Sequence, residues 1–444
     1  MLSLNSLSEG YHTVAIAFPD VQGRLLGRRI PARHFLDNPE QELSICTASL
    51  AWDISEGVPH VVPFAGHHTG WHDVYVRPAL ETLRPYPGVA GTAICIGDVY
   101  DEEGHLLEIA PRTILRRQLE RARKLGYTVL LASELEFYLF QGDIRTARLK
   151  RFQGLEPTTI VRSDYSIVGQ AVQEPFIQRI RREMETAGIP IYACQAEYGL
   201  GQWEVNLEHA EAMEMCDRHA VYKSGVKELA LQSGLTLTFM AKPIAADTGS
   251  SCHFHCSVRS GDNPIFAEAV GARQLSTAGK TFLGGLMSHL SETALFYAPY
   301  VNSYKRHAGE DYGGGVIAWG NDNRTVTFRV LGAGNSLRLE HRYAGADANP
   351  YLAAAAIIAA GLDGIENSLD PGASIMGNAY ERRDLRRAPA SLGEAVESFA
   401  GSEFASAAFG KEVIDHYVAH ARGEWNGYLK TVTDWELDRA FELV

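Results

Sequence analysis

Two glutamates lie two positions apart in the middle of an apolar segment. Residues 128–140 read TVLLASELEFYLF, and Glu134 and Glu136 are the only charged residues in this segment. On a strand, residues two apart point to the same face. Burying two carboxylates side by side is unfavourable, because desolvation and mutual repulsion both raise their pKa values. The pair therefore predicts bound metal ions. The alternative, a strand with its acidic face in solvent, would also expose Leu130 and Tyr138.

Four further short segments carry polar or charged groups at alternate positions. Each segment places three such residues on one face. The four sets are Gln202, Glu204 and Asn206; His253, His255 and Ser257; Thr325, Thr327 and Arg329; and Arg338, Glu340 and Arg342. One such strand is usually a half-exposed edge. Five of them, carrying acids, imidazoles and guanidiniums, predict the inner face of a barrel or curved sheet. We expect these side chains to line a catalytic funnel.

The residue types in these segments indicate the chemistry. Carboxylates with one imidazole suit Mg²⁺ or Mn²⁺ better than zinc. Guanidiniums among divalent ions are what a transferring phosphoryl group and a substrate carboxylate require, which implicates ATP. The chain has no Walker A sequence, and residues 199–204 do not fit a dinucleotide-binding fingerprint. The nucleotide site must therefore belong to another kind of fold.

Composition narrows the class of partner. The chain has 444 residues, 45% of them hydrophobic, and a formal net charge of -13 without a Lys/Arg-rich tract. This balance disfavours nucleic acid and membrane surfaces as partners and favours small molecules. The first twenty residues do not resemble a secretory signal, and the apolar stretch 351–362 is too short to span a bilayer. Six cysteines without CxxC pairs fit reduced thiols, so we expect a cytoplasmic protein.

The elements that must position these residues divide the chain into two parts. Residues 1–105 contain short apolar segments (13–17, 45–52 and 92–96) between Gly-, Pro- and His-rich loops, with a turn at 101–104, and predict a small, mostly β domain. Residues 106–444 predict one larger unit in which strands alternate with helices. The expected helices cover residues 111–126, 174–187, 210–232, 349–367 and a segment from 411 onward.

Several longer motifs carry a resemblance. They are SELEF at 133–137, the block 197–204, FMAKP followed by GSSCHFH at 239–255, NSYKR at 302–306, NDNR at 321–324, LRLEHR at 337–342 and NPYL at 349–352. With these motifs, the chain resembles the glutamine synthetase superfamily over nearly its whole length. The resemblance implies an α+β fold. A β-grasp-like domain (1–105) would precede a catalytic domain (106–444) with a curved, barrel-like antiparallel sheet surrounded by helices.

The resemblance also implies roles for individual residues. Glu136, Glu197 and Glu204 would hold one metal ion, and Glu134, His253 and Glu340 a second. Gly249, Arg306 and Arg342 would bind L-glutamate, and His255, Ser257, Arg329 and Arg338 would bind ATP. Arg324 would stabilise the transferred phosphoryl group, and Asp53 would assist deprotonation of the amine in a neighbouring subunit's site. The family's reaction is phosphorylation of glutamate by ATP and displacement of phosphate by an amine. The family forms stacked rings, commonly dodecamers, so we expect a homo-oligomer with shared active sites.

One position departs from the family pattern. Bacterial glutamine synthetases resemble one another in having a glutamate at the position six residues after the one that corresponds to Arg306. That glutamate lies on a flap and takes the proton of ammonium. This chain has Tyr312 there, although a small local shift would bring Glu310 or Asp311 into the role. The change favours a roomier nucleophile pocket. Thr248 replaces the usual Asn.

The neighbouring motifs resemble the glutamate-amine ligase branch, which includes γ-glutamylpolyamine, γ-glutamylethanolamine and γ-glutamyl-alkylamide or anilide synthetases. Three hypotheses follow: a ligase for an organic amine, an ammonia-using glutamine synthetase, and a catalytically silent structural or regulatory relative. The amine itself stays open. The acidic residues Glu56, Glu310 and Asp311 suit a polyamine, whereas Trp52 and Tyr312 suit an alkyl or aromatic group.

Overall fold

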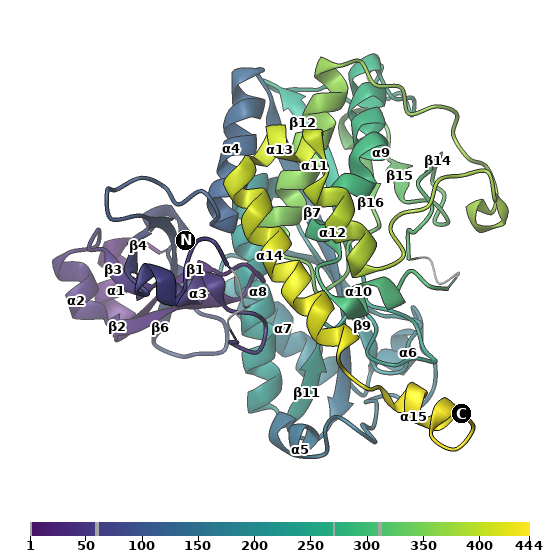
Figure 1. Cartoon of the computed structure of the whole chain (residues 1–444). Helices are drawn as coiled ribbons and strands as arrows, with labels where there is room; N and C mark the ends of the chain where they lie inside the picture. Colours follow the sequence, from purple (N-terminus) through teal and green to yellow (C-terminus); the bar gives the residue numbers. More distant parts are fainter. Residues whose placement is uncertain (1, 58–61, 270, 310–312) are drawn as a thin grey trace.

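The computed structural model describes residues 2–57, 62–269, 271–309 and 313–444 (Figure 1). The flap position Tyr312, with Glu310 and Asp311, lies outside the described residues. Two separate sheets organise the chain, one in the N-terminal part and one in the remainder.

The N-terminal sheet is mixed and has the strand order β2-β1-β6-β4-β3, with β5 paired to β6. Its strands are β1 (Thr13–Pro19), β2 (Leu25–Pro31), β3 (Leu43–Cys46), β4 (Asp73–Pro78), β5 (Arg84–Pro85) and β6 (Thr92–Tyr100). Three short helices accompany them: α1 (Leu4–Gly10), α2 (Ala32–Asp37) and α3 (Ala48–Ala51). The strands β1 and β6 are parallel and almost entirely buried, so they form the centre of this part.

The apolar segment 45–52 does not form one continuous strand. Its strand ends at Cys46, and α3 follows directly. The Ser49 hydroxyl donates to the Cys46 carbonyl over 2.9 Å, a local side-chain bond that competes with strand pairing. This turn brings Trp52 and Asp53 to the end of α3.

The larger sheet is built around one long strand, β7 (Thr128–Gln141). The strand order is β14-β15-β16-β12-β7-β9-β8, with β10 and β11 also paired to β7 and β13 to β12. The other strands are β8 (Ile191–Ala196), β9 (Gln202–Leu207), β10 (Ala210–Glu211), β11 (Leu235–Thr238), β12 (Cys252–Ser260), β13 (Asn263–Pro264), β14 (Trp319–Asn321), β15 (Phe328–Leu331) and β16 (Arg338–His341). Helices surround this nearly closed, barrel-like sheet, which confirms the predicted fold class (Figure 1). The domain boundary near residue 105 stays a prediction.

Four of the five predicted helices begin and end within two residues of the predicted positions, and the fifth, predicted from residue 411 onward, begins at Lys411 and ends at Leu429. The five helices are α4 (Pro111–Lys124), α7 (Glu174–Thr186), α8 (Ala212–Gln232), α11 (Pro350–Glu366) and α14 (Lys411–Leu429). Proline at the first turn starts α4 and α11, and the side chain of Asn349 caps α11. No helix in the described ranges is both long and apolar enough to cross a bilayer.

The Ala-rich helix α11 packs closely on α9 (Thr277–Tyr297) because glycines lie between them. A Cβ atom added to Gly285 would lie 2.0 Å from the Ala360 carbonyl oxygen, and one added to Gly364 would lie 2.1 Å from the Thr281 carbonyl oxygen. Such distances exclude any side chain at either position. This helix pair packs with α4 and α12 among the helices that surround the sheet (Figure 1).

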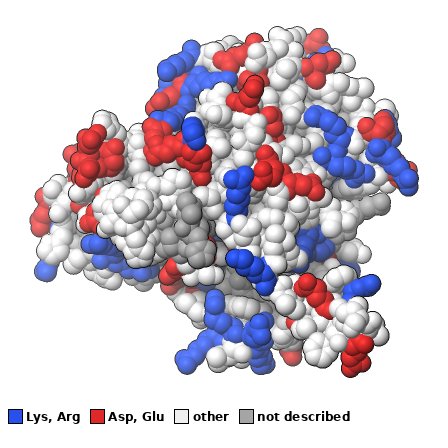
Figure 2. Space-filling model, in the orientation of Figure 1, with Lys and Arg blue, Asp and Glu red and all other residues white. Residues whose placement is uncertain are grey.

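The remaining helices are shorter and lie toward the outside. They are α5 (Ile144–Leu149), α6 (Ile167–Gln170), α10 (Val301–Lys305), α12 (Leu392–Ala400), α13 (Glu403–Phe409) and α15 (Asp434–Ala440). The face in Figure 2 shows acidic and basic residues interspersed.

Candidate active site

The pairing of five strands gathers the predicted polar residues into one place. Glu134 of β7 lies opposite His253 of β12, and Glu136 lies opposite Glu204 of β9. On the far side of β12, His255 lies opposite Glu340 of β16. This register explains the alternation in the sequence. Residues two apart on one strand share a face, and paired residues on neighbouring strands point to the same side of the sheet.

Glu134 is bonded to both imidazoles of β12. Its Oε1 lies 2.7 Å from His255 Nε2, and its Oε2 lies 3.3 Å from His253 Nδ1. Burial acts to raise the pKa of Glu134, but the hydrogen bonds from His253 and His255 outweigh it, and the pKa is lowered. Glu134 is therefore held as a carboxylate.

Glu340 is buried and is neutralised by two guanidiniums. Its Oε2 accepts from Arg329 Nη1 over 3.1 Å, and Arg342 donates to Oε1. His253 Nδ1 lies 3.5 Å from Oε1. Burial acts to raise the pKa of Glu340, but the positive charge of Arg342 leads the opposing effects and the pKa is lowered.

A second group of carboxylates, the β9 group, consists of Glu204 of β9, Glu136 of β7 and Glu197 in the loop between β8 and β9, and these acids repel one another. Burial, followed by repulsion from Glu197, raises the pKa of Glu136 to about 8. Burial, followed by repulsion from Asp164, raises the pKa of Glu197 to about 7. The pKa of Glu204 is raised well above its ordinary value by burial and by Glu134, Glu136 and Glu197. Burial and repulsion between acids therefore outweigh the attraction of Arg306 and Arg324 at this point.

The neighbours of these acids are neutral donors. Gln202 Nε2 and the Ser251 amide each donate to Glu136 Oε2 over 2.9 Å. Gln195 Nε2 donates to Glu204 Oε1 over 2.8 Å, and Asn206 Nδ2 donates to the same oxygen over 3.0 Å. These bonds orient the carboxylates without neutralising them.

The donor set fits divalent cations. The ligand atoms of Glu134, Glu204 and His253 lie within 4.8 Å of one another, as do those of Glu134, His255 and Glu340. Most donors are carboxylate oxygens, which Mg²⁺ and Mn²⁺ prefer. The buried His253 Nε2 has no hydrogen-bond partner among the described residues. Glu134 belongs to both groups, and the predicted division of the ligands between two ions stays a prediction.

Two cavities meet at Glu134. The first, the carboxylate cavity, has a volume of about 590 Å³. Its lining includes nine predicted site residues: Glu134, Glu136, Glu197, Glu204, Gly249, His253, Arg324, Arg329 and Arg342. The second, the imidazole cavity, has a volume of about 580 Å³ and is lined by Glu134, His255, Ser257 and Arg338 among others. Arg338 Nε donates to His255 Nδ1 over 3.1 Å.

Three predicted site residues of the described ranges do not line these cavities: Glu340, which is bonded to Arg329 and Arg342 of the carboxylate cavity, Arg306 and Asp53. Arg306 is 2% exposed, and its guanidinium donates to Ser251 Oγ and to the carbonyls of Arg342, Tyr343 and Ala344. Asp53 lines a different, small cavity of about 60 Å³ between the N-terminal part and α14. The predicted roles of Arg306 and Asp53, glutamate binding and amine deprotonation, stay predictions.

The predicted strand at residues 325–329 is wrong in its first half. The strand β15 begins at Phe328, and Thr325 lies in a turn in which its amide and hydroxyl bond to Asn323 Oδ1. The Thr327 hydroxyl donates to the carbonyls of Gly314 and Val316. Local side-chain bonds thus displace the expected pairing, and of this segment only Arg329 lines the carboxylate cavity.

Sequence reasoning missed several residues of the carboxylate cavity. Gln195 donates to Glu204 and Glu197, Asp164 and Tyr165 line the cavity wall, and Ser251 bonds Glu136 and Arg306. Gln195 and Ser251 each stand two positions before a predicted ligand, Glu197 or His253, and this spacing was a usable signal. Asp164 lies in a loop, where no periodicity marks it.

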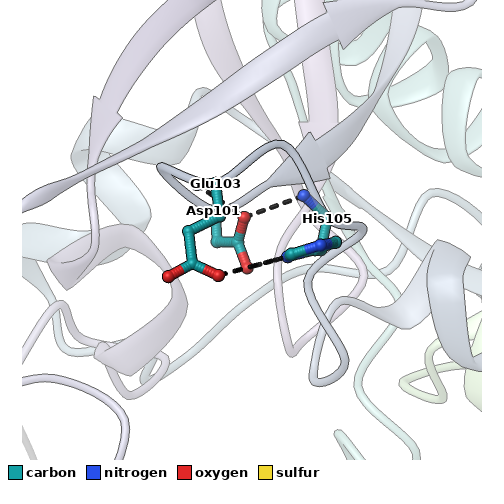
Figure 3. A group of neighbouring side chains, drawn as sticks. All are labelled: Asp101, Glu103 and His105. Carbon is teal, nitrogen blue, oxygen red and sulfur yellow. Dashed lines mark hydrogen bonds and ion pairs between the residues drawn. The ribbon is translucent and has the colours of Figure 1, made fainter.

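A separate acidic group lies at the turn after β6 (Figure 3). His105 Nδ1 lies 3.4 Å from Asp101 Oδ2 and 3.5 Å from Glu103 Oε2, and the His105 side chain is 72% exposed. Asp101 Oδ1 accepts from the amides of Glu103 and His105. These hydrogen bonds are those of the predicted turn. They explain why the three side chains lie close together without a bound ligand.

Fold and site together define a class of protein: an enzyme built on a curved sheet with a buried carboxylate centre. Residues 108–440 match the sequence profile described as "Glutamine synthetase, catalytic domain", and the chain belongs to the glutamine synthetase family.

Curated relatives narrow the comparison. The chain is 43% identical over 432 residues to the gamma-glutamylethanolamide synthetase of Streptomyces coelicolor, covering 97% of this chain and 92% of that protein. It is 35% identical over 437 residues to a glutamate-isopropylamine ligase of a Pseudomonas species, covering 97% and 95%. A solved structure titled "Apo GmaS without ligand" superimposes with a TM-score of 0.86 at 29% identity, covering 100% of both chains.

Proposed function

We propose that this protein is an ATP-dependent ligase that joins the γ-carboxylate of L-glutamate to an organic amine. The product would be a γ-glutamylamide, formed through a γ-glutamyl phosphate with release of ADP and phosphate. The observation that carries the proposal is the junction of the two cavities at Glu134, with acids and arginines on one side and His255, Ser257 and Arg338 on the other. The named activities of the two relatives support an amine as the second substrate.

Each cavity suits one substrate. Glutamate would occupy the carboxylate cavity, with Arg342 and the backbone at Gly249 as its contacts. ATP would enter through the imidazole cavity, with Arg338 and Ser257 along its length and its terminal phosphate directed toward Glu134. Guanidiniums bind both phosphates and carboxylates through paired hydrogen bonds, which explains their place at the junction.

Positioning and charge stabilisation supply most of the rate of phosphoryl transfer. When bound, Mg²⁺ or Mn²⁺ neutralises the negative charge of the transferring phosphoryl group; Glu134, Glu136, Glu197, Glu204, His253 and Glu340 would hold the ions. Arg324 and Arg329 both line the carboxylate cavity and would stabilise the three equatorial oxygens. Arg306 would support the glutamate site through Ser251 and the carbonyls that it bonds.

The second step requires a neutral amine. An alkylammonium ion cannot attack, so a carboxylate must take its proton. Asp53 would fill this role, with Tyr312 shaping the nucleophile pocket. Asp53 lies outside both cavities of its own chain, which supports a site completed by a neighbouring subunit. We therefore propose a cytoplasmic homo-oligomer of stacked rings, with a dodecamer as the expected form.

The test is glutamate-dependent release of phosphate from ATP with Mg²⁺ or Mn²⁺. Ammonium is compared with ethanolamine, isopropylamine, a polyamine and aniline. We expect at least one organic amine to exceed ammonium in kcat/KM. Equal rates with ammonium and every amine at low millimolar concentration would contradict the proposal, and absence of turnover with any nucleophile would support a silent relative.

A Tyr312→Glu variant tests the nucleophile pocket separately. Restoring a carboxylate at the flap position should increase turnover with ammonium, because the added group accepts the proton of ammonium. Unchanged use of ammonium would show that Tyr312 does not occupy the flap position. Glu310→Gln and Asp311→Asn variants then identify whether either acid takes that role.

A further inference from the structure

The loop that carries Asp53 is a closed turn built on the Asp53 side chain. Asp53 Oδ1 accepts from the amides of Ser55 and Gly57 over 2.7 and 2.8 Å. The Asp53 amide donates to the Gly57 carbonyl over 2.7 Å. A Cβ atom at Gly57 would lie 2.9 Å from Asp53 Oδ2, so this position admits only glycine without displacing the carboxylate. One carboxylate oxygen thus shapes the turn, and Oδ2 is left for other chemistry.

Two side chains from another loop fasten this turn from outside. Gln22 Nε2 donates to the Trp52 carbonyl over 2.9 Å, and Arg24 Nη1 donates to the Ile54 carbonyl over 3.1 Å. These carbonyls flank Asp53 on either side. Arg24 Nη2 also donates to Gln22 Oε1 over 3.3 Å, so the two side chains support each other.

The loop that supplies Gln22 and Arg24 is itself anchored in the larger part of the protein. The fully buried Asp20 side chain accepts from Arg24 Nε over 2.7 Å and from the amides of Gln22 and Arg24. Asn349 Nδ2 donates to the carbonyls of Asp20 and Val21 over 3.2 Å each. Asn349 also caps the buried helix α11. A continuous chain of bonds therefore links the catalytic part to the Asp53 turn.

The Asp53 carboxylate lies beside charged groups of its own chain. It shares the 60 Å³ cavity with Gln22, His420 and Glu424, the last two from α14. Among the described residues, the titratable groups that line this cavity or bond to the turn are Arg24, Tyr300, Tyr417, His420 and Glu424. A turn free to rotate would move the carboxylate among these groups, so its orientation depends on the two outer bonds.

We infer that Gln22 and Arg24 are positioning residues, which hold the Asp53 carboxylate in the orientation in which it takes a proton from the amine. This inference rests on the proposed function, because it needs Asp53 to act on the second substrate. It adds to that function a pair of side chains about thirty positions before Asp53 in the sequence. Their role is confined to the proton transfer and does not extend to glutamate phosphorylation.

The test compares two nucleophiles in a Gln22→Met variant of the full-length protein. Methionine has a similar length but cannot donate to the Trp52 carbonyl. An alkylamine is protonated near pH 7 and needs the carboxylate, whereas hydroxylamine is already neutral and does not. We expect kcat/KM for the best alkylamine of the panel to fall roughly tenfold to a hundredfold at pH 7. With hydroxylamine, kcat/KM should stay within about twofold of the wild type.

A pH profile and two further variants sharpen the result. The loss with the alkylamine should shrink as pH rises, since more of the amine in solution is neutral. Arg24→Lys keeps the charge beside Asp20 but cannot form all of the guanidinium bonds, and should show the same nucleophile dependence. Glu42→Gln, which breaks the exposed Arg77–Glu42 pair in the same N-terminal part, should change neither reaction.

The outcomes separate this inference from the proposed function. Equal losses of kcat/KM with both nucleophiles, or no loss with the alkylamine, would overturn the inference about Gln22 and Arg24. Ligase activity of the wild-type protein would still support the proposed function in that case. A wild-type protein that turns over no nucleophile would overturn both. Thermal unfolding of each variant shows whether a general loss of activity reflects a failure to fold.

Discussion

Two buried groups of charged residues in this protein have opposite electrostatic character. At the junction of the two sheets, Arg112 lies between Asp217, at 2.9 Å, and Asp98, at 2.5 Å, and Arg116 also pairs with Asp98. Burial acts to raise the pKa of Asp98, but Arg112 and Arg116 outweigh it and the pKa is lowered. Every carboxylate of this group has a guanidinium beside it.

In the part of the chain that the structure describes, no guanidinium forms an ion pair with Glu136, Glu197 or Glu204. Glu136 and Glu204 are as deeply buried as Asp98 and Glu197 is half-buried, yet the pKa values of all three are raised by burial and by neighbouring acids. A buried charge is tolerated when it is paired and is costly when it is not. The charges of the group at Arg112 are thus balanced within the chain, which fits a role in stability, whereas we propose that the β9 group is balanced by bound cations and serves function.

The largest effect is expected on activity, from removing one acid of the β9 group. Glu204→Gln should lower kcat with the best amine by roughly a thousandfold, because a lost ligand removes several kcal/mol of charge stabilisation from phosphoryl transfer. The free energy of unfolding of the metal-free protein should not fall, because one repulsive charge is lost. Phosphate release and urea unfolding in EDTA measure the two. Retained activity in Glu204→Gln, or a clear loss of its stability, would contradict the difference between the β9 group and the group at Arg112.

The complementary change is Arg112→Met. It leaves Asp98 and Asp217 buried without their main partner and should reduce the free energy of unfolding by about 3–5 kcal/mol. Urea unfolding followed by circular dichroism measures this. Arg117→Met is the matched control on the same helix, since its pair with Glu108 is exposed and should contribute less than about 1 kcal/mol. Similar losses in the two variants would contradict the assignment of Arg112 as structural.

Metal binding should stabilise the protein through the β9 group and the histidines of β12, and not through the group at Arg112. At a Mg²⁺ concentration a hundredfold above its dissociation constant, the free energy of unfolding should rise by about 2.7 kcal/mol. Glu204→Gln should lose most of this increment, and the control Arg117→Met should keep it. Thermal unfolding with and without Mg²⁺ gives the comparison, and an increment retained in Glu204→Gln would place the cation elsewhere.

The smallest effect concerns a third group, at His289, which is paired but half-buried. The His289 imidazole lies 2.5 Å from Glu292 and 2.8 Å from Asp363. Burial acts to lower the pKa of His289, but these two carboxylates raise it. Because the folded-state pKa is raised, the stabilisation is fully present below about pH 6.5 and is lost as pH rises through the raised value.

We expect this pair of contacts to contribute about 0.5–1 kcal/mol. His289→Gln should lower stability at pH 5.5 and have little effect at pH 9, as measured by urea unfolding across that range. A larger loss of unfolding free energy at pH 9 than at pH 5.5 would contradict the predicted direction of the pH dependence.

Much of the site was predictable because it follows local patterns. The alternation of Glu134 with Glu136, and of His253 with His255, fixes which side chains share a face, and these residues do line the two cavities. Strand register then brings the segments together. The group at Arg112 was not predicted, because its members come from β6, α4 and α8 and no spacing relates them.

Hydrogen bonds made by side chains limited the prediction of the remaining residues. Thr325 and Thr327 have a strand-like pattern, but their hydroxyls bond to Asn323 and to nearby carbonyls. Arg306 was assigned to glutamate by resemblance, and its guanidinium is bonded to backbone carbonyls and Ser251. Such contacts depend on tertiary placement, which neither periodicity nor a motif specifies.

The central claim is that the acids of the β9 group and the histidines of β12 form a divalent-cation centre. The direct test counts Mn²⁺ bound per chain in the EDTA-treated, full-length protein by equilibrium dialysis. We predict about two ions per chain in the wild type, and a loss of binding in Glu204→Gln but not in Arg117→Met. A wild-type protein that binds no Mn²⁺ at millimolar concentration would contradict the account.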